Sequence, residues 1–558
     1  MKYSDICSGG SRLYLPGNEN LFDYYVRNTE QYGNINAFVT FGKNHTRNEF
    51  MEDIKALSAF FEKEIGLKKG DVYTVLLPTN VESIILLMAL NRIGVITNLV
   101  HPMTPPVSLK EIIRFTKSTG IATLDMFLPN FAGVIKECGI SCLACVPATY
   151  AIDNKYAAPV SPVALEAVSG IEVFNSYPEA LKKYEGQDAE NLSHCKDDVA
   201  VYMNGGGTTG VSKTIKLTNY NINFVTWMTC DDNYPVSEPG VETVVCCLPH
   251  FHCFGLICSG LCPLHEGAKC AFLPSFDADK FVQIMKTEKV HEFNSVPNMY
   301  TKLLAHPEFA GPHIANIKTI FIGGDALQKD VYDKLRSVLK EYGSKAPVCQ
   351  GYGLTECGAV NVVNRPWDNK PGTVGVVQRF MELTIRDDDF NILPDGEIGE
   401  ICMSGPNVMQ GYLTEDGPID EGITYDENGN RWVRTGDLGY LDEDGFLVFV
   451  GRKKRVVIIS GYNVYPRDIE NIVINYPEIK EVCAVQGYEG ASPIVRIFLV
   501  LEDAENTDKA ALEEKIKKDC LENISKFAVP KDFRYIDALP RTKMEKIDFM
   551  SLSQFKPE

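Results

Sequence analysis

Residues 201–219 of the chain read VYMNGGGTTGVSKTIKLTN: an apolar start, a run of glycine and threonine, and then Lys213. Glycine leaves backbone N–H groups accessible and adopts conformations closed to other residues, so the run predicts a loop that cradles a phosphate. A flexible surface turn is the alternative. The common nucleotide loop G-x-x-x-x-G-K-[ST] does not fit, because Val211 stands where its lysine belongs and Lys213 comes two residues late.

The composition of the whole chain is that of a globular protein. With 558 residues the chain is too long for one compact core, so two or more domains are expected. Of these residues, 45% are hydrophobic and 23% are charged. The formal net charge of −19 argues against nucleic acid as a partner, because proteins that bind long nucleic acids usually carry a basic face.

The sequence predicts a cytoplasmic protein with no integral membrane segment. Its N-terminus lacks the basic segment and apolar core of a secretory signal. The strongest apolar run, Ser83–Leu90, is far shorter than the roughly 20 residues that span a bilayer. The 17 cysteines therefore indicate reduced and mostly buried thiols.

Three of these cysteines, Cys138, Cys142 and Cys145, have the spacing C-x3-C-x2-C, which resembles the iron–sulfur motif of radical SAM enzymes. Thiolates at this spacing can hold three irons of a four-iron cluster. Ala144 stands where an aromatic residue is usual, however, and no strand–helix barrel clearly surrounds the motif. We therefore expect a buried strand here, and a radical SAM enzyme stays a remote alternative.

The first part of the chain alternates between helices and strands. Thr46 and Glu49 form a capping box, and apolar residues recur at helical spacing from there to Ile65. Strands are predicted, with helical segments between them, in VYTVLLP, ITNLV, VETVVCCLP, KCAFLP, KTIFIGG and KAPVCQGYG. This alternation predicts an α/β fold with largely parallel sheets.

After about residue 370, short apolar alternations with Asp, Gly and Asn turns predict a β-rich subdomain. The last segment has strands of its own and a Lys/Glu-rich helix. We place a boundary at the basic run Arg452–Arg455. This gives a large N-terminal domain, residues 1–453, and a small α+β C-terminal domain, residues 454–558.

Further motifs decide between a phosphate loop and a surface turn. They are LPHFHCFGL (248–256), FIGGDAL (321–327), GYGLTECG (351–358), PDGEIGEICMSGPNVMQGYL (394–413), RTGDLGYLDEDGFLVFVGRKKRVVIISGYNVYPRDIE (434–470) and LPRTKMEKID (539–548). Together with GGTTGVSK they resemble, in the same order, the motifs of the acyl-adenylate-forming superfamily of AMP-binding enzymes. The resemblance covers roughly residues 35–550 and is strongest to a freestanding acyl-CoA synthetase.

The resemblance implies a reaction in two steps. A carboxylic acid attacks the α-phosphate of ATP, which gives an acyl-adenylate and pyrophosphate, and the acyl group then passes to CoA. The expected partners are therefore a small-molecule carboxylic acid, ATP and CoA, with Mg²⁺ as the metal. In this superfamily the small domain is mobile and rotates between the two steps.

The resemblance also assigns residues to the nucleotide phosphates. In the glycine-rich loop, the β- and γ-phosphates would be held by Gly207, Thr208, Thr209 and Gly210, with Lys213 in register behind them. Backbone N–H groups and hydroxyls are suited to this role.

GYGLTECG is expected to serve both the α-phosphate and the adenine. Thr355 would contact the α-phosphate, and Glu356 would coordinate Mg²⁺, a hard cation suited to a carboxylate and phosphate oxygens. Tyr352 would lie against adenine. Three residues of FIGGDAL would line the same slot: Gly324, Asp325 and Ala326.

Four further residues complete the expected adenylation site. Asp437 would accept hydrogen bonds from the ribose hydroxyls, and Arg452 would reach the ribose and phosphate edge. Lys546 would place its ammonium between the carboxylate and the α-phosphate. His252 would lie near the carboxylate end of the acyl pocket, although a core histidine is the alternative there.

The second step is expected to use the region around the basic run. The resemblance places the pivot of the rotation at Lys454, and Gly461 would line the channel for the pantetheine of CoA. The sequence alone predicts only a basic run, Arg452–Arg455, on an exposed hinge. This run could also attract nucleotide or CoA phosphates.

The chain departs from the usual motifs at four positions. Gly206 replaces Ser or Thr, Ser212 replaces proline and Thr214 replaces glycine around the phosphate loop. Glu545 replaces the glycine before Lys546 and adds a negative charge there. We expect these changes to affect the rate and the nucleotide affinity without removing an essential role.

The acceptor of the acyl group and the identity of the carboxylic acid are predicted from less specific sequence features. HFHCFGL lacks the aspartate that binds the substrate amine in peptide-synthetase adenylation domains, and no carrier-protein serine motif follows residue 550. CoA is therefore favoured, with loading of a separate acyl carrier protein as the alternative. The expected pocket segments FHCFGL, NSVPNMY and GYGLTECGAV are mostly apolar, which favours a fatty or aryl acid of modest size.

Overall fold

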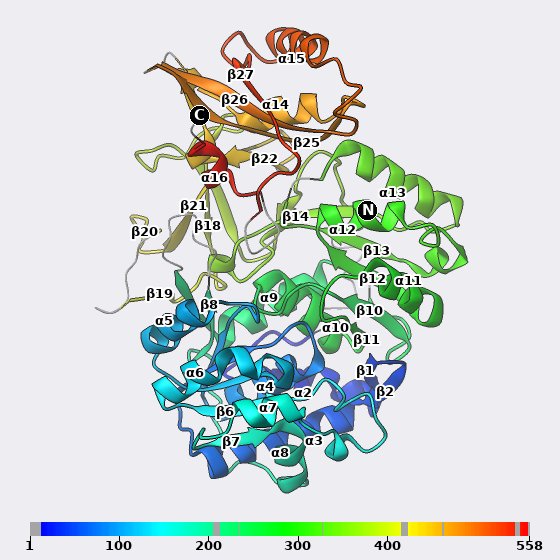
Figure 1. Cartoon of the computed structure of the whole chain (residues 1–558), viewed down its shortest axis with the longest axis vertical. Helices are drawn as coiled ribbons and strands as arrows, with labels where there is room; N and C mark the ends of the chain where they lie inside the picture. Colours follow the sequence, from blue (N-terminus) through cyan, green and yellow to red (C-terminus); the bar gives the residue numbers. More distant parts are fainter. Residues whose placement is uncertain are drawn as a thin grey trace. The chain divides into compact units, whose positions relative to one another are not determined.

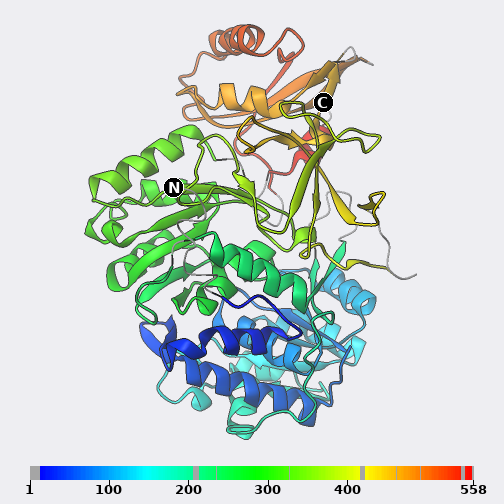
Figure 2. The same ribbon diagram turned by 180° about the vertical axis from the view of Figure 1, so that it is seen from behind.

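A computed structural model describes residues 13–204, 213–233, 235–325, 327–414, 422–459, 462–490, 492–541 and 547–555 (Figures 1 and 2). The chain divides into two compact units. The first contains most of the chain up to Val433, and the second contains Leu383–Cys402 and the chain from Arg434 onward. The boundary between residues 453 and 454 stays a prediction.

The first unit contains a nine-stranded sheet in the order β16-β15-β14-β13-β12-β10-β11-β1-β2, counted over its described residues. The central strands from β14 to β1 run parallel, and the strands at both edges are antiparallel. Its strands are β1 (Asn36–Thr40), β2 (Lys43–Thr46), β10 (Glu242–Cys246), β11 (Lys269–Phe272), β12 (Lys289–Ser295), β13 (Thr319–Ile322), β14 (Val348–Tyr352), β15 (Val362–Val363) and β16 (Val376–Val377).

A second sheet of the first unit has the order β19-β9-β8-β4-β3-β5-β6-β7 among the residues described. The six strands from β8 to β7 run parallel, whereas β9 and β19 are antiparallel to their neighbours. Its strands are β3 (Val72–Leu76), β4 (Ile96–Leu99), β5 (Ser118–Leu124), β6 (Ser141–Cys145), β7 (Phe174–Ser176), β8 (Val199–Asn204), β9 (Thr214–Thr218) and β19 (Gly411–Leu413).

Helices cover both sheets of the first unit and connect their parallel strands (Figure 1). They are α2 (Leu21–Thr29), α3 (Arg47–Phe60), α4 (Val81–Arg92), α5 (Pro106–Thr116), α6 (Leu128–Cys138), α7 (Pro162–Ala167), α8 (Tyr177–Lys183), α9 (Asn219–Asp231), α10 (Cys262–His265), α11 (Ala278–Thr287), α12 (Pro297–Ala305) and α13 (Lys329–Glu341). A π-helix, η5 (Phe254–Leu261), precedes α10, and a short 3₁₀ helix, η7 (Thr355–Cys357), follows β14.

The second unit is α+β. A β-rich part contains β17 (Glu382–Arg386), β18 (Gly399–Ser404), β21 (Arg431–Leu441) and β22 (Leu447–Arg452), and β20 (Ile423–Tyr425) pairs with the first residues of β21. The C-terminal part has the hairpin β23 (Val457–Ile459) and β24 (Tyr462–Val464), the sheet β25 (Ile479–Glu489), β26 (Ser492–Leu501) and β27 (Asp532–Tyr535), and the helices α14 (Pro466–Val473), α15 (Lys509–Asn523) and α16 (Phe549–Ser553).

The predicted elements are confirmed. The capping box of Thr46 and Glu49 begins α3, and the helical path continues through the π-helix η2 (Phe61–Ile65). Each predicted strand of the α/β part is present as β3, β4, β10, β11, β13 or β14. The buried run Ser83–Leu90 lies in α4, and among the described residues no helix is both long and apolar enough to cross a membrane.

Candidate active site

Three of the motifs follow parallel strands of the nine-stranded sheet. LPHFHCFGL comes after β10, FIGGDAL after β13 and GYGLTECG at the end of β14. β13 and β14 are hydrogen-bonded neighbours, with Ile322 paired with Gln350. Because ligands of α/β proteins bind beyond the carboxyl ends of parallel strands, this edge of the sheet is the candidate active site.

Glu356 is held by two contacts with the segment that ends in β19. Its Oε1 accepts a hydrogen bond from Oη of Tyr412 at 3.0 Å, and its backbone carbonyl accepts one from the N–H of Met409 at 2.8 Å. The neighbouring Thr355 begins η7 after an extended Leu354. The short helix and the two contacts thus fix the direction of the Glu356 carboxylate.

Tyr412 also contacts Lys213. The Lys213 ammonium lies over the Tyr412 ring, 4.9 Å from its centroid, a distance at which cation and ring attract each other. The pairing of β19 with β9 places Tyr412 opposite Ile215, two residues after Lys213. The structure therefore brings Lys213 and Glu356 to the same tyrosine. Tyr412 is not among the residues predicted from the sequence, although the M-x-G-Y pattern contains it.

The two histidines of LPHFHCFGL have different surroundings. His250 is 1% exposed and its Nδ1 lies 2.6 Å from Oγ of Ser83. Burial lowers the pKa of His250 to about 3, so this imidazole stays neutral at physiological pH. His252 is half-buried and packs against Phe251, with ring centroids 5.4 Å apart. His250 is thus a core residue, and His252 is the better candidate for contact with a substrate.

Cys253 joins this motif to GYGLTECG. Burial raises the pKa of its thiol, and the nearby charge of Glu356 adds to the effect. A hydrogen bond with Thr355 acts in the opposite direction. These interactions place the residue after His252 beside the two proposed phosphate and metal contacts.

Two glycines of the motifs lie so close to another part of the backbone that no side chain would fit. A Cβ atom on Gly255 would lie 2.1 Å from the carbonyl oxygen of Pro249, and one on Gly353 would lie 1.5 Å from that of Ala359. Both distances are far below van der Waals contact. These glycines therefore allow the tight chain path at the candidate site.

We expect Gly255→Ala to lower the free energy of unfolding by about 1–3 kcal/mol, because the added methyl group forces the backbone apart. Urea denaturation measures the change. Gly133→Ala is the matched control: Gly133 lies in α6 with no atom within 4 Å of an added Cβ, so alanine should leave stability unchanged or raise it by about 0.5–1 kcal/mol. Equal effects of the two substitutions would contradict the expectation.

The residues proposed for the adenine lie at neighbouring strand ends. Tyr352 ends β14 and pairs with Val362. Gly324 has a φ of +80° and is exposed, as is Asp325, directly after β13. The structure thus places these three proposed contacts at the same sheet edge. Other proposed residues lie outside the described residues: Gly207, Thr208, Thr209, Gly210, Ala326, Gly461 and Lys546.

In the second unit, Asp437 and Arg452 lie opposite each other on β21 and β22. The Nε atom of Arg452 is 2.9 Å from Oδ1 of Asp437. Asp437 is buried, whereas 58% of the Arg452 side chain is exposed. The two proposed ribose contacts are therefore brought together as an ion pair. Lys454 is exposed in the 3₁₀ helix η8 (Lys453–Arg455), directly after β22.

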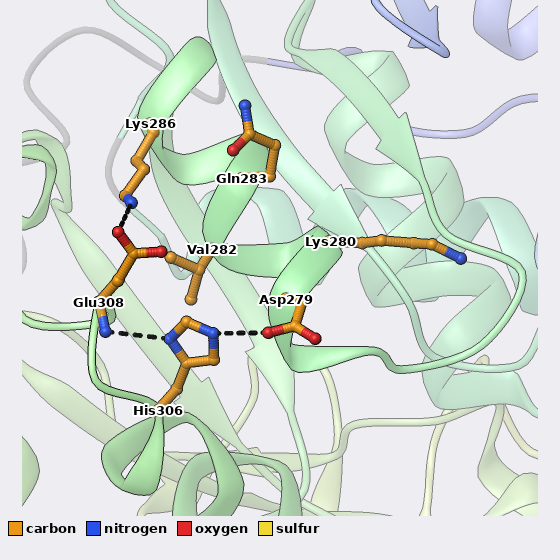
Figure 3. Close-up of a pocket in the computed structure, with 7 residues that line it drawn as sticks. All are labelled: Asp279, Lys280, Val282, Gln283, Lys286, His306 and Glu308. Carbon is orange, nitrogen blue, oxygen red and sulfur yellow. Dashed lines mark hydrogen bonds and ion pairs between the residues drawn. The ribbon is translucent and has the colours of Figure 1, made fainter.

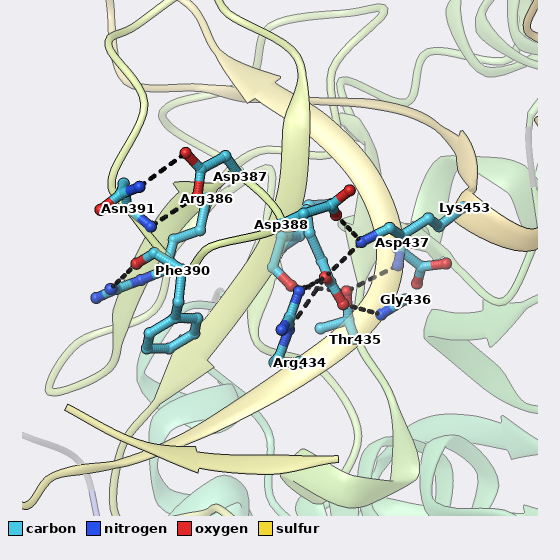
Figure 4. Close-up of polar contacts among 12 residues, drawn as sticks. Arg386, Asp387, Asp388, Phe390, Asn391, Arg434, Thr435, Gly436, Asp437 and Lys453 are labelled. Atoms are coloured by element: carbon cyan, nitrogen blue, oxygen red, sulfur yellow. Dashed lines mark hydrogen bonds and ion pairs between the residues drawn. The ribbon is translucent and has the colours of Figure 1, made fainter. Parts of the chain in front are cut away.

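The stretch of β21 before Asp437 is held by the buried carboxylate of Glu400. Figure 4 shows Arg434, Gly436, Asp437 and Lys453 in this region. One oxygen of Glu400 accepts hydrogen bonds from Arg434, at 2.6 Å from Nη2, and from Lys453, at 3.1 Å from Nζ. The other oxygen accepts one from the N–H of Gly436 at 3.0 Å. The cations and this N–H outweigh burial and lower the pKa of Glu400. Glu400 was not selected from the sequence, although it lies in a quoted motif.

We expect Glu400→Gln to destabilise the protein by about 1–2 kcal/mol, less than for a fully buried ion pair because Arg434 and Lys453 are partly exposed. The KM for ATP should rise severalfold as the part of β21 that carries Asp437 loosens. Because the pKa of Glu400 is lowered from 4.5, its stabilising effect is present above that pH and is lost as the pH falls through the folded-state value. Denaturation at several pH values and ATP titration test this, with the exposed Glu397→Gln as control.

A narrow cavity of the first unit begins at the same motifs. It is lined by Phe254 of LPHFHCFGL, Gly323 of FIGGDAL and Gly351 of GYGLTECG. The volume of this cavity is about 30 Å³. The remaining lining residues are Thr229, Asp232, Asn233, Cys258, Cys262, Glu266, Glu292, Asn294, Phe321, Ile322, Val360, Val363 and Gln378. All three motifs of the sheet edge thus meet around one cavity.

A larger hollow of about 320 Å³ lies beside α11 (Figure 3). Its charged side chains bind one another: His306 Nε2 lies 2.9 Å from Oδ1 of Asp279, and Lys286 lies 2.7 Å from Glu308. None of the motif residues line it. The narrow cavity, and not this surface hollow, is therefore the candidate site.

Comparison with known proteins identifies the family of the chain. The model of the AMP-binding enzyme family matches residues 25–413, and that of the AMP-binding enzyme C-terminal domain matches residues 468–546. The chain is a member of the AMP-binding enzyme family. These two matches include all three motifs of the sheet edge and the segment with Lys546.

Relatives of this AMP-binding enzyme match nearly its whole length. A long-chain-fatty-acid–CoA ligase of Bacillus subtilis is 29% identical over 555 residues, which cover 96% of this chain and 94% of the ligase. A 4-coumarate:CoA ligase 1 of Petunia hybrida is 25% identical over 546 residues, 96% of this chain and 94% of the ligase. The fold is that of the o-succinylbenzoate–CoA synthetase MenE of Bacillus subtilis in complex with ATP and a magnesium ion (TM-score 0.74, 21% identity, 96% of this chain and 99% of that one).

The cysteine motif of this AMP-binding enzyme forms the buried strand that the sequence favours. Cys142 and Cys145 lie in β6, and because they are three residues apart their side chains point to opposite faces of the sheet. Burial raises the pKa of Cys142 to about 12, which keeps it a thiol. This geometry does not fit a cluster held by three thiolates.

Proposed function

We propose that this AMP-binding enzyme is an acyl-CoA synthetase. It activates a carboxylic acid with ATP to an acyl-adenylate and pyrophosphate, and transfers the acyl group to CoA to give acyl-CoA and AMP. One observation carries the proposal: Cys253 interacts with Thr355, and the next residue, Phe254, lines the cavity. A proposed contact of the α-phosphate is therefore adjacent to the narrow cavity around which the three motifs meet.

The proposed roles follow from charge and hydrogen bonding. Thr355 donates a hydrogen bond to the α-phosphate, and the ammonium of Lys546 stabilises the negative charge that develops between carboxylate and phosphate. Asp437 accepts hydrogen bonds from the ribose, and its ion pair with Arg452 orients it for this purpose. His252 lies at the carboxylate end of the acid, with Lys213 on the pyrophosphate side.

Glu356 is the proposed ligand of Mg²⁺. A carboxylate oxygen suits this cation, and the hydrogen bond from Tyr412 fixes the orientation of the group. When bound, Mg²⁺ neutralises part of the phosphate charge and so favours the departure of pyrophosphate. The chain itself contributes the fixed carboxylate and, through Lys213, a further positive charge near it.

The names of the relatives support a fatty or aryl acid, because one acts on long-chain fatty acids and another on 4-coumarate. Both names also support CoA as the acceptor. In the second step we propose that the pivot at Lys454 allows the small domain to turn and that Gly461 leaves room for the pantetheine thiol. The compartment that we propose is the cytoplasm.

The test is carboxylate-dependent exchange of labelled pyrophosphate into ATP over a panel of acids, followed by addition of CoA to the best acid. We expect exchange to depend on the acid and acyl-CoA to accumulate when CoA is present. Exchange without acyl-CoA formation would favour the carrier-protein alternative. No exchange with any acid would contradict the proposed function.

A further inference from the structure

The short helix η7 carries Thr355 and Glu356, two proposed contacts of the nucleotide and its metal, and only part of its backbone is hydrogen-bonded locally. The N–H of Cys357 donates to the carbonyl of Leu354 at 3.1 Å. The N–H of Gly358 donates to the carbonyl of Thr355 at 3.0 Å. The carbonyls of Glu356 and Cys357 lie at the end of the helix, where no further turn supplies a donor.

A segment distant in the sequence supplies donors to these two carbonyls. We name this segment, residues 405–413, the strap. The N–H of Met409 donates to the carbonyl of Glu356 at 2.8 Å. Nδ2 of Asn407 donates to the carbonyl of Cys357 at 2.6 Å. The end of η7 is therefore held by the strap.

Asn407 shares the Cys357 carbonyl with a second asparagine. Nδ2 of Asn361 donates to this carbonyl at 2.8 Å, so both lone pairs of the oxygen are used. Both asparagines are fully buried. Because a carbonyl can only accept, each amide must turn its NH₂ group toward Cys357. The two amides thus replace the donors that a longer helix would provide.

The strap is also bound to the strand that follows the glycine-rich loop. Its last three residues form β19, which pairs with β9 and places Gly411 opposite Lys216. The N–H of Gln410 donates to the Lys216 carbonyl at 2.9 Å. Since β9 begins at Thr214, directly after Lys213, the strap connects η7 to the strand that carries this lysine.

Asn221 of α9 fixes the first part of the strap. Its Nδ2 donates to the carbonyls of Pro406, at 2.9 Å, and Val408, at 3.1 Å. Its Oδ1 accepts from the N–H of Thr218, at 2.9 Å, in the capping box that begins α9. Asn221 is buried and uses the amide at both ends. The residues on both sides of Asn407 are therefore immobilised.

We propose that Asn407 is a positioning residue for the carboxylate that binds Mg²⁺. Through the Cys357 carbonyl and the strap it sets the direction of Glu356 relative to β9. This inference rests on the proposed function and adds a residue that the motifs did not assign to the site. Without this contact Glu356 keeps its charge and loses its fixed direction, so Mg²⁺ should bind more weakly.

The test compares Asn407→Ala with Asn364→Ala in the full chain. Asn364 is the matched control, because it is 1% exposed and its Nδ2 donates to the carbonyl of Thr373 at 2.9 Å, outside η7 and the strap. Each substitution removes a buried amide that binds a backbone carbonyl. Both variants should therefore have a lower Tm than the wild-type chain.

Two readouts measure the effect on Mg²⁺. We expect the Mg²⁺ concentration for half-maximal ATP–pyrophosphate exchange to rise about 10- to 100-fold in Asn407→Ala, with much of the rate recovered at high Mg²⁺. Isothermal titration calorimetry without acid measures how much Mg²⁺ increases the affinity for ATP, and this increase should fall by a similar factor. Asn364→Ala should keep the wild-type values of both quantities.

Asn361→Ala provides a second measurement should Asn407→Ala fail to fold. It removes the other donor to the Cys357 carbonyl. The Mg²⁺ requirement should shift in the same direction as in Asn407→Ala.

The outcomes separate the inference from the proposed function. Equal Mg²⁺ requirements of Asn407→Ala and Asn364→Ala would overturn the inference and leave the proposed function intact. A lower kcat of Asn407→Ala with unchanged dependence on Mg²⁺ would also overturn it, since it would show a purely structural role. Absence of exchange with every acid would contradict the proposed function, whereas the calorimetric comparison would still decide the role of Asn407.

Discussion

Replacing Lys546 with alanine is expected to lower the rate of acid-dependent ATP–pyrophosphate exchange by about 10²- to 10³-fold, the loss typical when one charge-stabilising donor is removed from an active site. The motif LPRTKMEKID carries this assignment, since Lys546 lies outside the described residues. A lysine between carboxylate and α-phosphate stabilises charge only as the bond forms. The loss should therefore appear in kcat and much less in the KM for ATP.

Lys543→Ala is the matched control for this experiment. It removes the same charge three residues earlier in the same motif. Exchange by Lys543→Ala should stay near the wild-type rate. If Lys546→Ala exchanged normally with the best acid, the assignment of Lys546 would be wrong, whatever the reaction.

Glu356→Gln is expected to lower kcat/KM for ATP by about 10²- to 10³-fold, because an amide oxygen is a much weaker ligand for Mg²⁺ than a carboxylate. The substitution keeps an oxygen that can accept the hydrogen bond from Tyr412, so the local fold should be retained. Circular dichroism and Tm check this. Steady-state kinetics over a range of Mg²⁺ concentrations measures the effect.

Tyr412→Phe tests the orientation of the Glu356 carboxylate without removing its charge. It removes only the hydroxyl that donates to Glu356, and the ring under Lys213 remains. Loss of such an outer contact typically costs 10- to 100-fold in metal affinity or activity. We expect higher Mg²⁺ to restore the rate of Tyr412→Phe but not that of Glu356→Gln. Wild-type kinetics in Glu356→Gln would exclude its role as the metal ligand.

The sequence predicted the fold well because its signals are local. Capping boxes, apolar periodicity and turn residues act within a few positions, and they identified α3 and the strands of the α/β part. The irregular parts were missed. The π-helix η5 begins within the motif LPHFHCFGL, and its Gly255 approaches Pro249 closely, a contact that no pattern of apolar residues reveals.

The candidate site could be predicted only in part. Motifs indicated Thr355, Glu356 and Asp437, because each lies in a short pattern of fixed spacing. Glu400 and Tyr412 lie in such patterns too, but their roles depend on contacts with distant segments. The polar residues of the cavity were missed for the same reason, since Asp232, Glu292 and Gln378 come from three separate parts of the chain.

The position of Glu400 has a consequence for the order of events in the reaction. Its carboxylate binds Arg434 and Gly436, which precede Asp437 in β21, and also Lys453, the neighbour of the proposed pivot Lys454. One anion therefore holds the proposed ribose contact and the proposed hinge in the same set of hydrogen bonds. Coupling between a binding site and a hinge is reciprocal. If a bound ligand favours one conformation of the hinge, that conformation must also bind the ligand more tightly. A nucleotide at the proposed ribose contact and a rotation at the proposed hinge would then be coupled through Glu400.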